Sequence, residues 1–475
     1  MRLSTNKTKI VATIGPATDT PEMLERLIRA GMNVARLNFS HGDFSDHADR
    51  IARIRAAEAA TGRRVAIMAD LPGPKMRVGK IAPEPIQLVA GADFILTSDD
   101  IIGDVTRVSM SFDPLPRVVK PGDRLFLNDG LIQLLVDRVV GTDVHCKVAV
   151  GGELRSKKGL NLPGINLGIS AFTDHDRACL EFALGHGVDA ISQSFVERAD
   201  DIHAVRAAAA ALGKNPFLIA KIERSDALDH LDEILKAADG LMVARGDLGV
   251  EVPIEQIAVL QKQIIAKATA AGKPVITATQ MLESMISSRL PTRAEATDVA
   301  NAILDGTDCI MLSGESAMGQ YPEEAVAMLA KIAASTESHR ELARLNGSLP
   351  GHRPVETTNA DEALADVVQH SIDIVPCSVV FVPTESGDTA RMISRFKSRV
   401  WIVAISRDMA VCKGLAFSYG VAAIHADRIP EDWRGFAGDW FHDNDMPPRL
   451  VILVAGPSRQ NPQANHRVEF LRFQP

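Results

Sequence analysis

Charged and hydroxyl side chains follow several short apolar segments of the chain, at spacings that could serve chemistry. Lys221 and Glu223 stand two residues apart in FLIAKIE, so both can point to the same face of one strand. Asp247 follows the next such segment, within RGDLG, a Gly-rich turn that could aim backbone N–H groups at an anion. Two carboxylates in a water-rich site suit Mg²⁺, and a lysine beside them can stabilise developing negative charge. The alternative is a salt-bridge cluster without a metal.

The segments that carry these residues alternate with helix-like stretches, several of which close with Gly. Eight near-continuous apolar strands, each followed by a helix, are what a closed parallel (β/α)8 barrel requires. We therefore predict an α/β fold built on a TIM barrel. The predicted strand ends are Ile14, Asn38, Asp70, Ser194, Glu223, Asp247, Thr279 and Ser313.

One interval between these ends is anomalous. The third and fourth ends lie 124 residues apart, against 24 to 34 residues elsewhere, which leaves room for an inserted domain of about 95 residues. The inserted sequence, residues 72–168, has short strand-like runs and turn signals and predicts a small all-β domain. We expect the barrel to comprise residues 1–71 and 169–340. A linker-like stretch at 346–354 then leads to an open α/β domain at 355–475.

In a barrel of this type the active site lies at the C-terminal ends of the strands. Polar residues could simply end strands in loops, but their convergence at seven ends favours a site. The polar side chains at or near the predicted ends are Arg36, Asn38, Ser40, Asp70, Lys221, Glu223, Arg245, Asp247, Thr279 and Ser313.

Composition narrows the classes of ligand. The 475 residues carry 52 Lys and Arg against 60 Asp and Glu, a net charge of −8, and only 4% are aromatic. A nucleic-acid or anionic-membrane surface requires the opposite sign, and base stacking requires aromatic side chains, so we expect neither partner. Any anionic ligand must therefore meet a local basic pocket.

The five cysteines are scattered, without a CxxC or zinc-ligand spacing, and fit reduced thiols better than a disulfide framework. The N-terminal residues lack a signal-peptide pattern, and no run reaches 18 apolar residues. We therefore expect a soluble, cytoplasmic protein.

Four other features are weaker. GPKMRVGK, residues 73–80, has the wrong spacing for a Walker phosphate loop and lacks its closing Ser or Thr. The pair Lys157–Lys158 is either a ligand contact or a solvated charge run, and His41 is either a helix cap or a ligand contact. The segment SGDTAR in the third domain either holds a phosphate or starts a helix.

Several segments, in this order and at this spacing, resemble pyruvate kinase: GMNVARLNFSHG, SKKGLNLPG, AKIER, MVARGDLGVE, PTRAEATDVANAILDG and CIMLSGESAMGQYPEEAV. The resemblance covers residues 5–335 closely and the C-terminal domain loosely. It implies a (β/α)8 barrel with an inserted small β-barrel that acts as a lid, a C-terminal α/β domain, and a homo-oligomer, usually a tetramer. It also implies the reaction of phosphoenolpyruvate with ADP to give pyruvate and ATP, the last step of glycolysis.

The resemblance further assigns roles at the barrel mouth. Lys221 would stabilise the transition state, and Glu223 and Asp247 would hold Mg²⁺. Arg36 would bind the substrate phosphate, with the substrate carboxylate held by Thr279 and the N–H groups of Gly246 and Asp247. Protonation of the enolate would pass through water and through hydroxyls such as those of Thr279 and Ser313.

The resemblance places the nucleotide against Asn38, His41, Arg77 and Lys158. Arg77 and Lys158 stand at the two margins of the insert, so closure of the lid could bring them onto ADP and expel water.

The family's monovalent-cation site matches the side chains of Asn38, Ser40 and Asp70 and the backbone carbonyl of Leu71. This chain departs from the family at Lys75, where K⁺-dependent members carry a glutamate. The ammonium could occupy the same region, and two cations about 4 Å apart repel by ~1–4 kcal/mol. We therefore expect that K⁺ is not required; the alternative is that Lys75 points into solvent.

The effector loop of the family carries acidic side chains here, Glu385 and Asp388. We expect regulation that is weak or unlike the sugar-bisphosphate type. The stretch 428–448 is shorter than in the family and is expected to be irregular, which leaves a dimer as an alternative to the tetramer.

Two other functions compete with this interpretation. A Mg²⁺-dependent lyase acting on 2-oxo acids would share the barrel and the enolate chemistry, but it would not need the insert with Arg77 and Lys158. A nucleotide or metabolite sensor that kept the fold would not need the lysine and carboxylates of the expected site.

Overall fold

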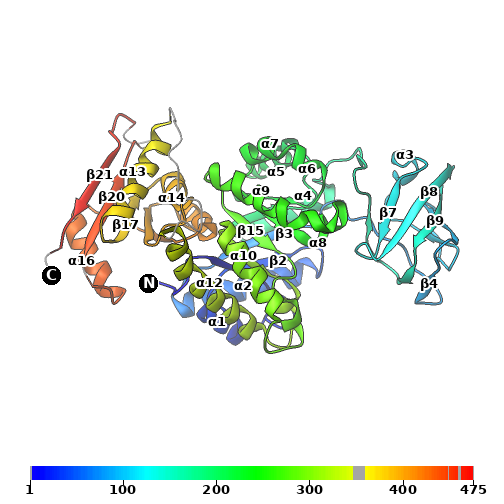
Figure 1. The fold of residues 1–475 in the computed structure, drawn as a ribbon, viewed down its shortest axis with the longest axis horizontal. Helices are drawn as coiled ribbons and strands as arrows, with labels where there is room; N and C mark the ends of the chain where they lie inside the picture. Colours follow the sequence, from blue (N-terminus) through cyan, green and yellow to red (C-terminus); the bar gives the residue numbers. More distant parts are fainter. Residues whose placement is uncertain (1–2, 346–358, 448, 458–461, 474–475) are drawn as a thin grey trace.

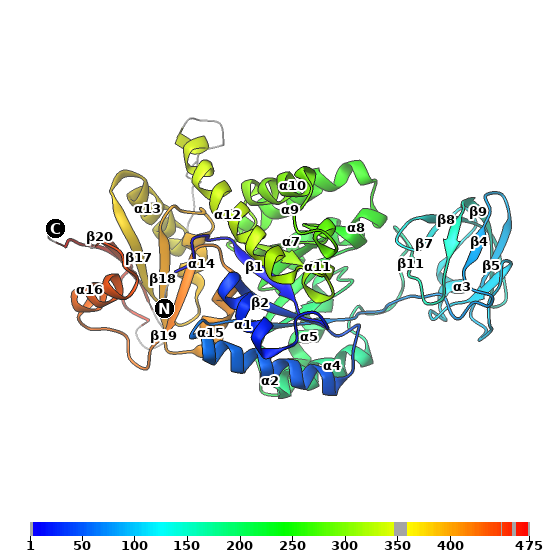
Figure 2. The ribbon, with the colours of Figure 1, turned by 90° about the horizontal axis from the view of Figure 1, so that it is seen from below.

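A computed structural model describes residues 3–345, 359–447, 449–457 and 462–473 of the chain. Its three parts stand in a row, with the barrel in the middle, the insert at one end and the C-terminal domain at the other (Figure 1, Figure 2). The expected linker at 346–354 lies outside the described residues. Within the described ranges, no helix combines the length and the apolar character needed to cross a membrane.

Eight parallel strands close the barrel in the order β1-β16-β15-β14-β13-β12-β3-β2, which confirms the predicted TIM-barrel fold class. Strands β1, β14 and β16 are buried at every residue, as expected of parallel strands covered by helices. The strands are β1 (Lys9–Thr13), β2 (Met32–Asn38), β3 (Ala66–Leu71), β12 (Ala190–Gln193), β13 (Phe217–Ile222), β14 (Gly240–Ala244), β15 (Val275–Ala278) and β16 (Cys309–Leu312).

Side-chain caps fix where the helices of the barrel begin. Thr20 accepts a hydrogen bond from the N–H of Met23, and Asp43, Thr173 and Thr292 each form a capping box. The longer helices are α1 (Pro21–Ala30), α2 (Phe44–Thr61), α4 (Asp174–Gly185), α5 (Ala199–Ala211), α9 (Ile257–Ala270), α10 (Arg293–Asp305) and α12 (Pro322–Leu345). The short ones are α6 (Asp226–Asp229), α7 (Leu231–Ala237), α8 (Arg245–Glu251), α11 (Gly314–Ala317), η1 (Ile254–Gln256) and η2 (Glu283–Ile286).

The insert follows β3 and is built of strands, apart from the four-residue helix α3 (Leu115–Val118). Six strands form a sheet in the order β11-β7-β8-β9-β5-β6, and β4 pairs with β10. Arg77 bridges to Gly159 beside one edge strand and Val78 to Met110 beside the other, so this segment gives the sheet a barrel-like closure. The strands are β4 (Ile86–Leu88), β5 (Asp93–Thr97), β6 (Arg107–Ser109), β7 (Arg124–Leu127), β8 (Ile132–Val140), β9 (Asp143–Val150), β10 (Gly152–Leu154) and β11 (Leu160–Asn161).

The C-terminal domain is an open sheet in the order β19-β18-β17-β20-β21, parallel except for β21. Its helices include α13 and α16, which Figure 1 shows on either side of the sheet. The elements are α13 (Ala360–Ile374), β17 (Cys377–Pro383), α14 (Asp388–Ser394), β18 (Trp401–Ser406), α15 (Met409–Gly414), η3 (Leu415–Phe417), β19 (Val421–His425), α16 (Trp433–Asp443), β20 (Leu450–Ala455) and β21 (Arg467–Leu471).

One expectation about this domain is wrong. The stretch 428–448 was expected to be irregular, but it contains the eleven-residue helix α16. Asp432 caps the helix, and Trp440 packs edge-on against Phe381 of β17 at 5.6 Å between ring centroids. Aromatic packing on the sheet therefore sustains a helix that Gly435 and Gly438 weaken locally.

The C-terminal domain also completes the floor of the barrel. Phe417 is 1% exposed and packs in one cluster with strand residues such as Val11 and Met242. Its ring stacks on Phe217 at 5.2 Å, and its carbonyl accepts from the thiol of Cys309. Because Phe217 and Cys309 begin their strands, the plug lies at the end of the barrel opposite the polar strand ends.

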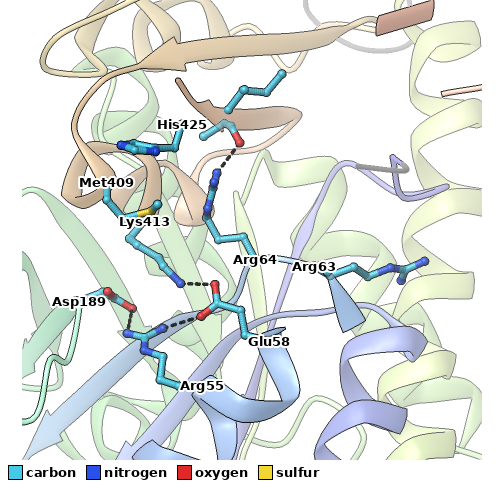
Figure 3. Close-up of a pocket in the computed structure, with 11 residues that line it drawn as sticks. Arg55, Glu58, Arg63, Arg64, Asp189, Met409, Lys413 and His425 are labelled. Atoms are coloured by element: carbon cyan, nitrogen blue, oxygen red, sulfur yellow. Dashed lines mark hydrogen bonds and ion pairs between the residues drawn. The ribbon is translucent and has the colours of Figure 1, made fainter. Parts of the chain in front are cut away.

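Ion pairs hold the same two domains together farther out, around a pocket that Figure 3 shows. Glu58 of α2 pairs with Lys413 of α15 and, at 3.0 Å, with Arg55. Arg55 also pairs with Asp189, which precedes β12, at 2.7 Å. The cations lining this pocket are thus already engaged by protein groups.

We expect Phe417→Ala to lower the free energy of unfolding by about 3–5 kcal/mol, because it leaves a cavity in the barrel floor. Chemical denaturation followed by circular dichroism measures the loss. Phe470→Ala is the matched control, since Phe470 is 47% exposed, and it should cost about 1 kcal/mol or less. Equal losses in the two variants would contradict the role of Phe417 as a plug.

Candidate active site

Asp70 is the carboxylate at the centre of the barrel mouth. Its side chain is 1% exposed and lies between two cations, with Arg36 Nε donating to Oδ2 at 2.7 Å and Lys221 Nζ 3.2 Å from Oδ1. Burial alone would raise the pKa of Asp70, but Lys221 and Arg36 lower it to about 2. Asp70 is therefore an ionised counterion that holds both cations in place.

Lys221 reaches three acceptors from the end of β13. Its Nζ lies 2.7 Å from Glu223 Oε1 and donates to Ser194 Oγ at 2.7 Å, besides its contact with Asp70. Although burial opposes its charge, Asp70 and Glu223 raise the pKa of Lys221 above its ordinary value. The side chain is thus a permanent positive charge and is poorly suited to donate a proton.

Glu223 and Asp247 form a pair of carboxylates that fits a divalent cation. Glu223 Oε2 accepts from the N–H of Phe195 at 2.8 Å. Burial and the charge of Glu223 raise the pKa of Asp247 to about 6, which is the repulsion that a bound cation would relieve. Mg²⁺ is commonly held by one or two carboxylates, with water and substrate phosphate completing its shell. No group of three or more His, Cys, Asp or Glu in the described residues is placed to hold a metal.

The local setting of Asp247 differs from the expected turn. RGDLG forms the first part of helix α8, which begins at Arg245 directly after β14. The N–H of Gly246 donates to Thr279 Oγ1 at 2.8 Å, so two residues of the expected carboxylate cradle are in direct contact. Ser313 directly follows the neighbouring strand β16 and precedes helix α11.

Thr279 stands in a strained turn. Its φ is 71° and that of Gln280 is 54°, a left-handed conformation that is costly for a β-branched residue. Arg245 holds this turn, donating to the carbonyl of Thr279 at 2.7 Å and to that of Ala278 at 3.3 Å. Arg245 itself pairs with Asp298 at 2.7 Å, so a surrounding network supports the strained position.

A second group of cations lies at the rim, where the insert leaves the barrel. Burial, together with Lys221 and Arg77, lowers the pKa of Lys75 to about 8, although the side chain keeps solvent access. Burial and the charges of Lys75, Arg77 and Arg36 likewise lower the pKa of His41. His41, Lys75 and Arg77 therefore share one positive field beside the mouth.

Two further predicted nucleotide contacts are placed differently. Asn38 lies in the barrel wall, opposite Asp70 in the β2–β3 register, and its Oδ1 accepts from the N–H of Ser40 at 3.1 Å. Lys158 lies within the insert, where its carbonyl accepts from the N–H of Val78 at 2.9 Å. The structure thus gathers Asn38 and His41 near the mouth and leaves Lys158 on the separate insert.

Sequence reasoning did not single out two residues that complete this network. Ser194 accepts from Lys221 and donates to the carbonyl of Leu71 at 2.6 Å. Thr13 Oγ1 accepts from Arg36 at 2.9 Å. Both stand at or beside predicted strand ends, which was the one available signal.

Gly73 marks where the outgoing chain of the insert passes close to the site. It has φ of 65°, and a Cβ there would lie 2.7 Å from the ring of Phe195 and 3.2 Å from Ser194. Its N–H donates to Asp176 at 2.9 Å in the capping box of α4. Only glycine allows this close approach, which joins the insert to the residues around Lys221 and Glu223.

Known proteins resemble this chain over nearly its full length. The family model described as pyruvate kinase, barrel domain, matches residues 5–326, and that described as pyruvate kinase, alpha/beta domain, matches residues 362–460. The chain is 50% identical over 427 residues to a pyruvate kinase of Thermococcus litoralis and 41% identical over 425 residues to one of Clostridium acetobutylicum, covering 89% of each chain in both cases. A crystal structure of a pyruvate kinase from Cryptosporidium parvum matches with a TM-score of 0.89 at 35% identity, covering 98% of this chain and 96% of that one.

Proposed function

Because the chain belongs to the pyruvate kinase family, and therefore transfers the phosphoryl group of phosphoenolpyruvate to ADP in the last step of glycolysis, we propose that the cluster around Lys221 performs this transfer. The observation that carries the proposal is the permanent, buried charge of Lys221, held by Asp70, Glu223 and Ser194 at the C-terminal ends of the strands. Phosphoryl transfer needs positioning and charge stabilisation more than covalent chemistry, and this cluster supplies both.

The substrate would lie across the mouth of the barrel. Arg36, locked by Asp70 and Thr13, binds the phosphate, and Lys221 stabilises the charge that develops on the moving phosphoryl group and on the enolate oxygen. Thr279, Gly246 and the start of α8 receive the substrate carboxylate, supported by the contact between Gly246 and Thr279. Thr279 and Ser313 order the water that protonates the enolate.

The family uses Mg²⁺, and Glu223 and Asp247 are the residues that would hold it here. The ion would supply positive charge to the substrate oxygens that become more negative during transfer. Phe195 keeps Glu223 oriented through its N–H, whereas Asp247 keeps solvent access and can meet the ion from helix α8, which follows the neighbouring strand β14.

ADP would bind between the barrel and the insert. We assign the nucleotide to Asn38 and His41 on the barrel, residues 1–71 and 169–340. The other contacts, Arg77 and Lys158, belong to the insert, residues 72–168, which acts as a lid. The positive field shared by His41, Lys75 and Arg77 supports this assignment, because the diphosphate is strongly negative. Closure would carry Lys158 to the mouth and exclude water.

We further propose that the protein works in the cytoplasm as a homo-oligomer. The five free cysteines are all buried, and burial raises the pKa of the thiols of Cys146, Cys179 and Cys309, which suits a reduced compartment. The family resemblance favours a tetramer, with a dimer as the alternative. Each subunit would include the C-terminal domain, residues 355–475.

Lys221→Met should lower kcat by about 10²–10³-fold in a lactate-dehydrogenase-coupled assay with phosphoenolpyruvate, ADP and Mg²⁺, because the charge acts on the transition state. Affinity for ADP, measured by calorimetry, should stay within about threefold. Lys267→Met, which removes an exposed lysine paired with Asp232, is the control and should leave both unchanged. A comparable loss of ADP affinity in Lys221→Met would show that the assigned role is wrong.

We also propose that catalysis does not require K⁺. Three of the four oxygen donors of the family's monovalent site are already engaged in this chain. Asp70 pairs with Arg36 and Lys221, the carbonyl of Leu71 accepts from Ser194, and Asn38 Oδ1 accepts from the N–H of Ser40.

Lys75 adds the positive charge that K⁺ would otherwise bring. Its side chain is exposed, but the charges of Lys221, Arg77, Asp70 and Asp247 all act on it, which supports a position near the site. A second cation about 4 Å away would be repelled by ~1–4 kcal/mol.

Turnover should therefore persist in a buffer free of K⁺, Na⁺ and NH₄⁺, with an organic counterion. Lys75→Glu should make the enzyme dependent on KCl, because it replaces the built-in cation with an anion, whereas Lys80→Glu, an exposed change in the insert, should not. Many-fold activation of the wild type by KCl would overturn the proposal.

The effector loop supports weak or altered regulation. The C-terminal domain holds a cavity of ≈ 1080 Å³ at the ends of its parallel strands, lined by Thr384, Glu385, Ser386, Arg407 and Arg428 among others. Two N–H groups of the loop donate to its own hydroxyls, Gly387 to Thr384 at 2.8 Å and Asp388 to Ser386 at 3.3 Å. A bound phosphate would have to displace these bonds beside two acidic side chains.

Fructose 1,6-bisphosphate should change the half-saturating phosphoenolpyruvate concentration by less than about twofold. An effector alters substrate affinity only as far as it binds one state of the enzyme more tightly than another, and the acidic loop is expected to bind the bisphosphate weakly. The double change Glu385→Ser and Asp388→Ser, which removes both negative charges, should increase the response. Strong relief of sigmoidal saturation in the wild type would contradict this expectation.

A further inference from the structure

Arg224 directly follows the expected metal ligand Glu223, yet none of the roles above uses it. Its side chain is 1% exposed and is the largest of the fully buried side chains of the described residues. A buried guanidinium is retained only where hydrogen bonds and carboxylates compensate its charge. The groups around Arg224 therefore indicate what it holds together.

One partner belongs to the chain that returns from the insert to the barrel, residues 162–173. Arg224 donates to the carbonyl of Ile165 in this segment at 2.8 Å. Closer to α4, the same segment is tied by Gln193, which donates to the carbonyl of Ala171 at 2.8 Å. Arg224 is thus the anchor nearer the insert, at the point where the returning chain first meets the barrel.

The other partners are two carboxylates from different loops. Arg224 Nε lies 3.4 Å from Glu197 in the loop after β12 and 3.6 Å from Glu251 at the end of α8. The loop of Glu197 also contains Phe195, whose N–H orients Glu223, and α8 begins with the residues Gly246 and Asp247. Burial raises the pKa of Glu251 to about 7 even beside Arg224, so this carboxylate depends on the cation.

We propose that Arg224 is a positioning residue that fastens the returning chain of the insert to the two segments that orient Glu223 and Asp247. Its hydrogen bond to Ile165 and its ion pairs with Glu197 and Glu251 join three segments that are far apart in sequence. The position of the insert over the nucleotide and the arrangement of the carboxylate pair are thereby coupled through one side chain. The expected change in kinetics rests on the proposed function, whereas the expected loosening of the returning chain rests on the geometry alone.

Arg224→Lys tests the proposal while keeping the buried positive charge. A single ammonium lacks the planar fork and cannot bond the Ile165 carbonyl while facing both carboxylates. Arg224→Met removes the charge as well and serves as the stronger variant where it folds. Arg206→Lys is the matched control, because Arg206 on α5 also donates to a carbonyl, that of Ala237 at 2.9 Å, and pairs with Asp239, away from the insert.

Amide hydrogen exchange of the full-length protein, followed by mass spectrometry, gives the first measurement. In Arg224→Lys we expect exchange in residues 162–170 to be about tenfold faster, with exchange in the barrel strands unchanged. Coupled assays give the second: kcat/KM for ADP should fall by about 10–100-fold while KM for phosphoenolpyruvate stays within about threefold, since the insert faces the nucleotide. Arg206→Lys should match the wild type in both.

The two proposals can fail separately. A wild type that does not turn over phosphoenolpyruvate and ADP defeats the proposed function, but the exchange comparison needs no substrate and still tests the anchor. A folded Arg224→Lys variant with wild-type exchange at 162–170, or with kinetics equal to those of Arg206→Lys, would overturn the role of Arg224.

Discussion

A single buried carboxylate, Asp70, is the interaction on which the rest of the site depends. Two cations, Arg36 and Lys221, project into the mouth of an apolar barrel, where an isolated charge would be costly to desolvate. Asp70 compensates both from β3, which adjoins the strand of Arg36 and is separated from that of Lys221 by β12. Glu223 and Ser194 also contact Lys221, and Thr13 accepts from Arg36. The barrel therefore keeps two fixed positive charges at its mouth, as the proposed phosphoryl transfer requires.

The three parts of the chain each contribute one boundary of this site. The C-terminal domain closes the floor through Phe417, the strands form the wall, and the insert stands beyond the mouth. Its two connections pass directly beside functional groups, at Gly73 next to Phe195 and at Ile165 on Arg224. The site is consequently linked to both neighbouring domains by packing, so a displacement of either one bears on the residues around Lys221.

Charge in this protein is arranged locally rather than globally. The chain as a whole is acidic, with a net charge of −8, yet Arg36 and Lys221 lie at the mouth and Lys75 and Arg77 at the rim. Lys75 is one of these cations, and the charges of Asp70 and Asp247 act on its side chain. Burial and then the charge of Lys75 lower the pKa of His41, an expected nucleotide contact.

The sequence alone was sufficient to predict the barrel, the insertion after its third strand, and the placement of Lys221 and Glu223 on one face of a strand. These features follow from periodicities of a few residues along the chain. Tertiary structure decided the remainder. Asp70 pairs with Lys221, which lies 151 positions later in the sequence. Ser194 and Thr13 likewise find their hydrogen-bond partners on other strands. The glycine-containing helix α16 forms because its aromatic side chains pack on β17. Such contacts depend on the register between distant segments, which no local pattern specifies; only closure of the barrel brings their atoms within hydrogen-bonding distance.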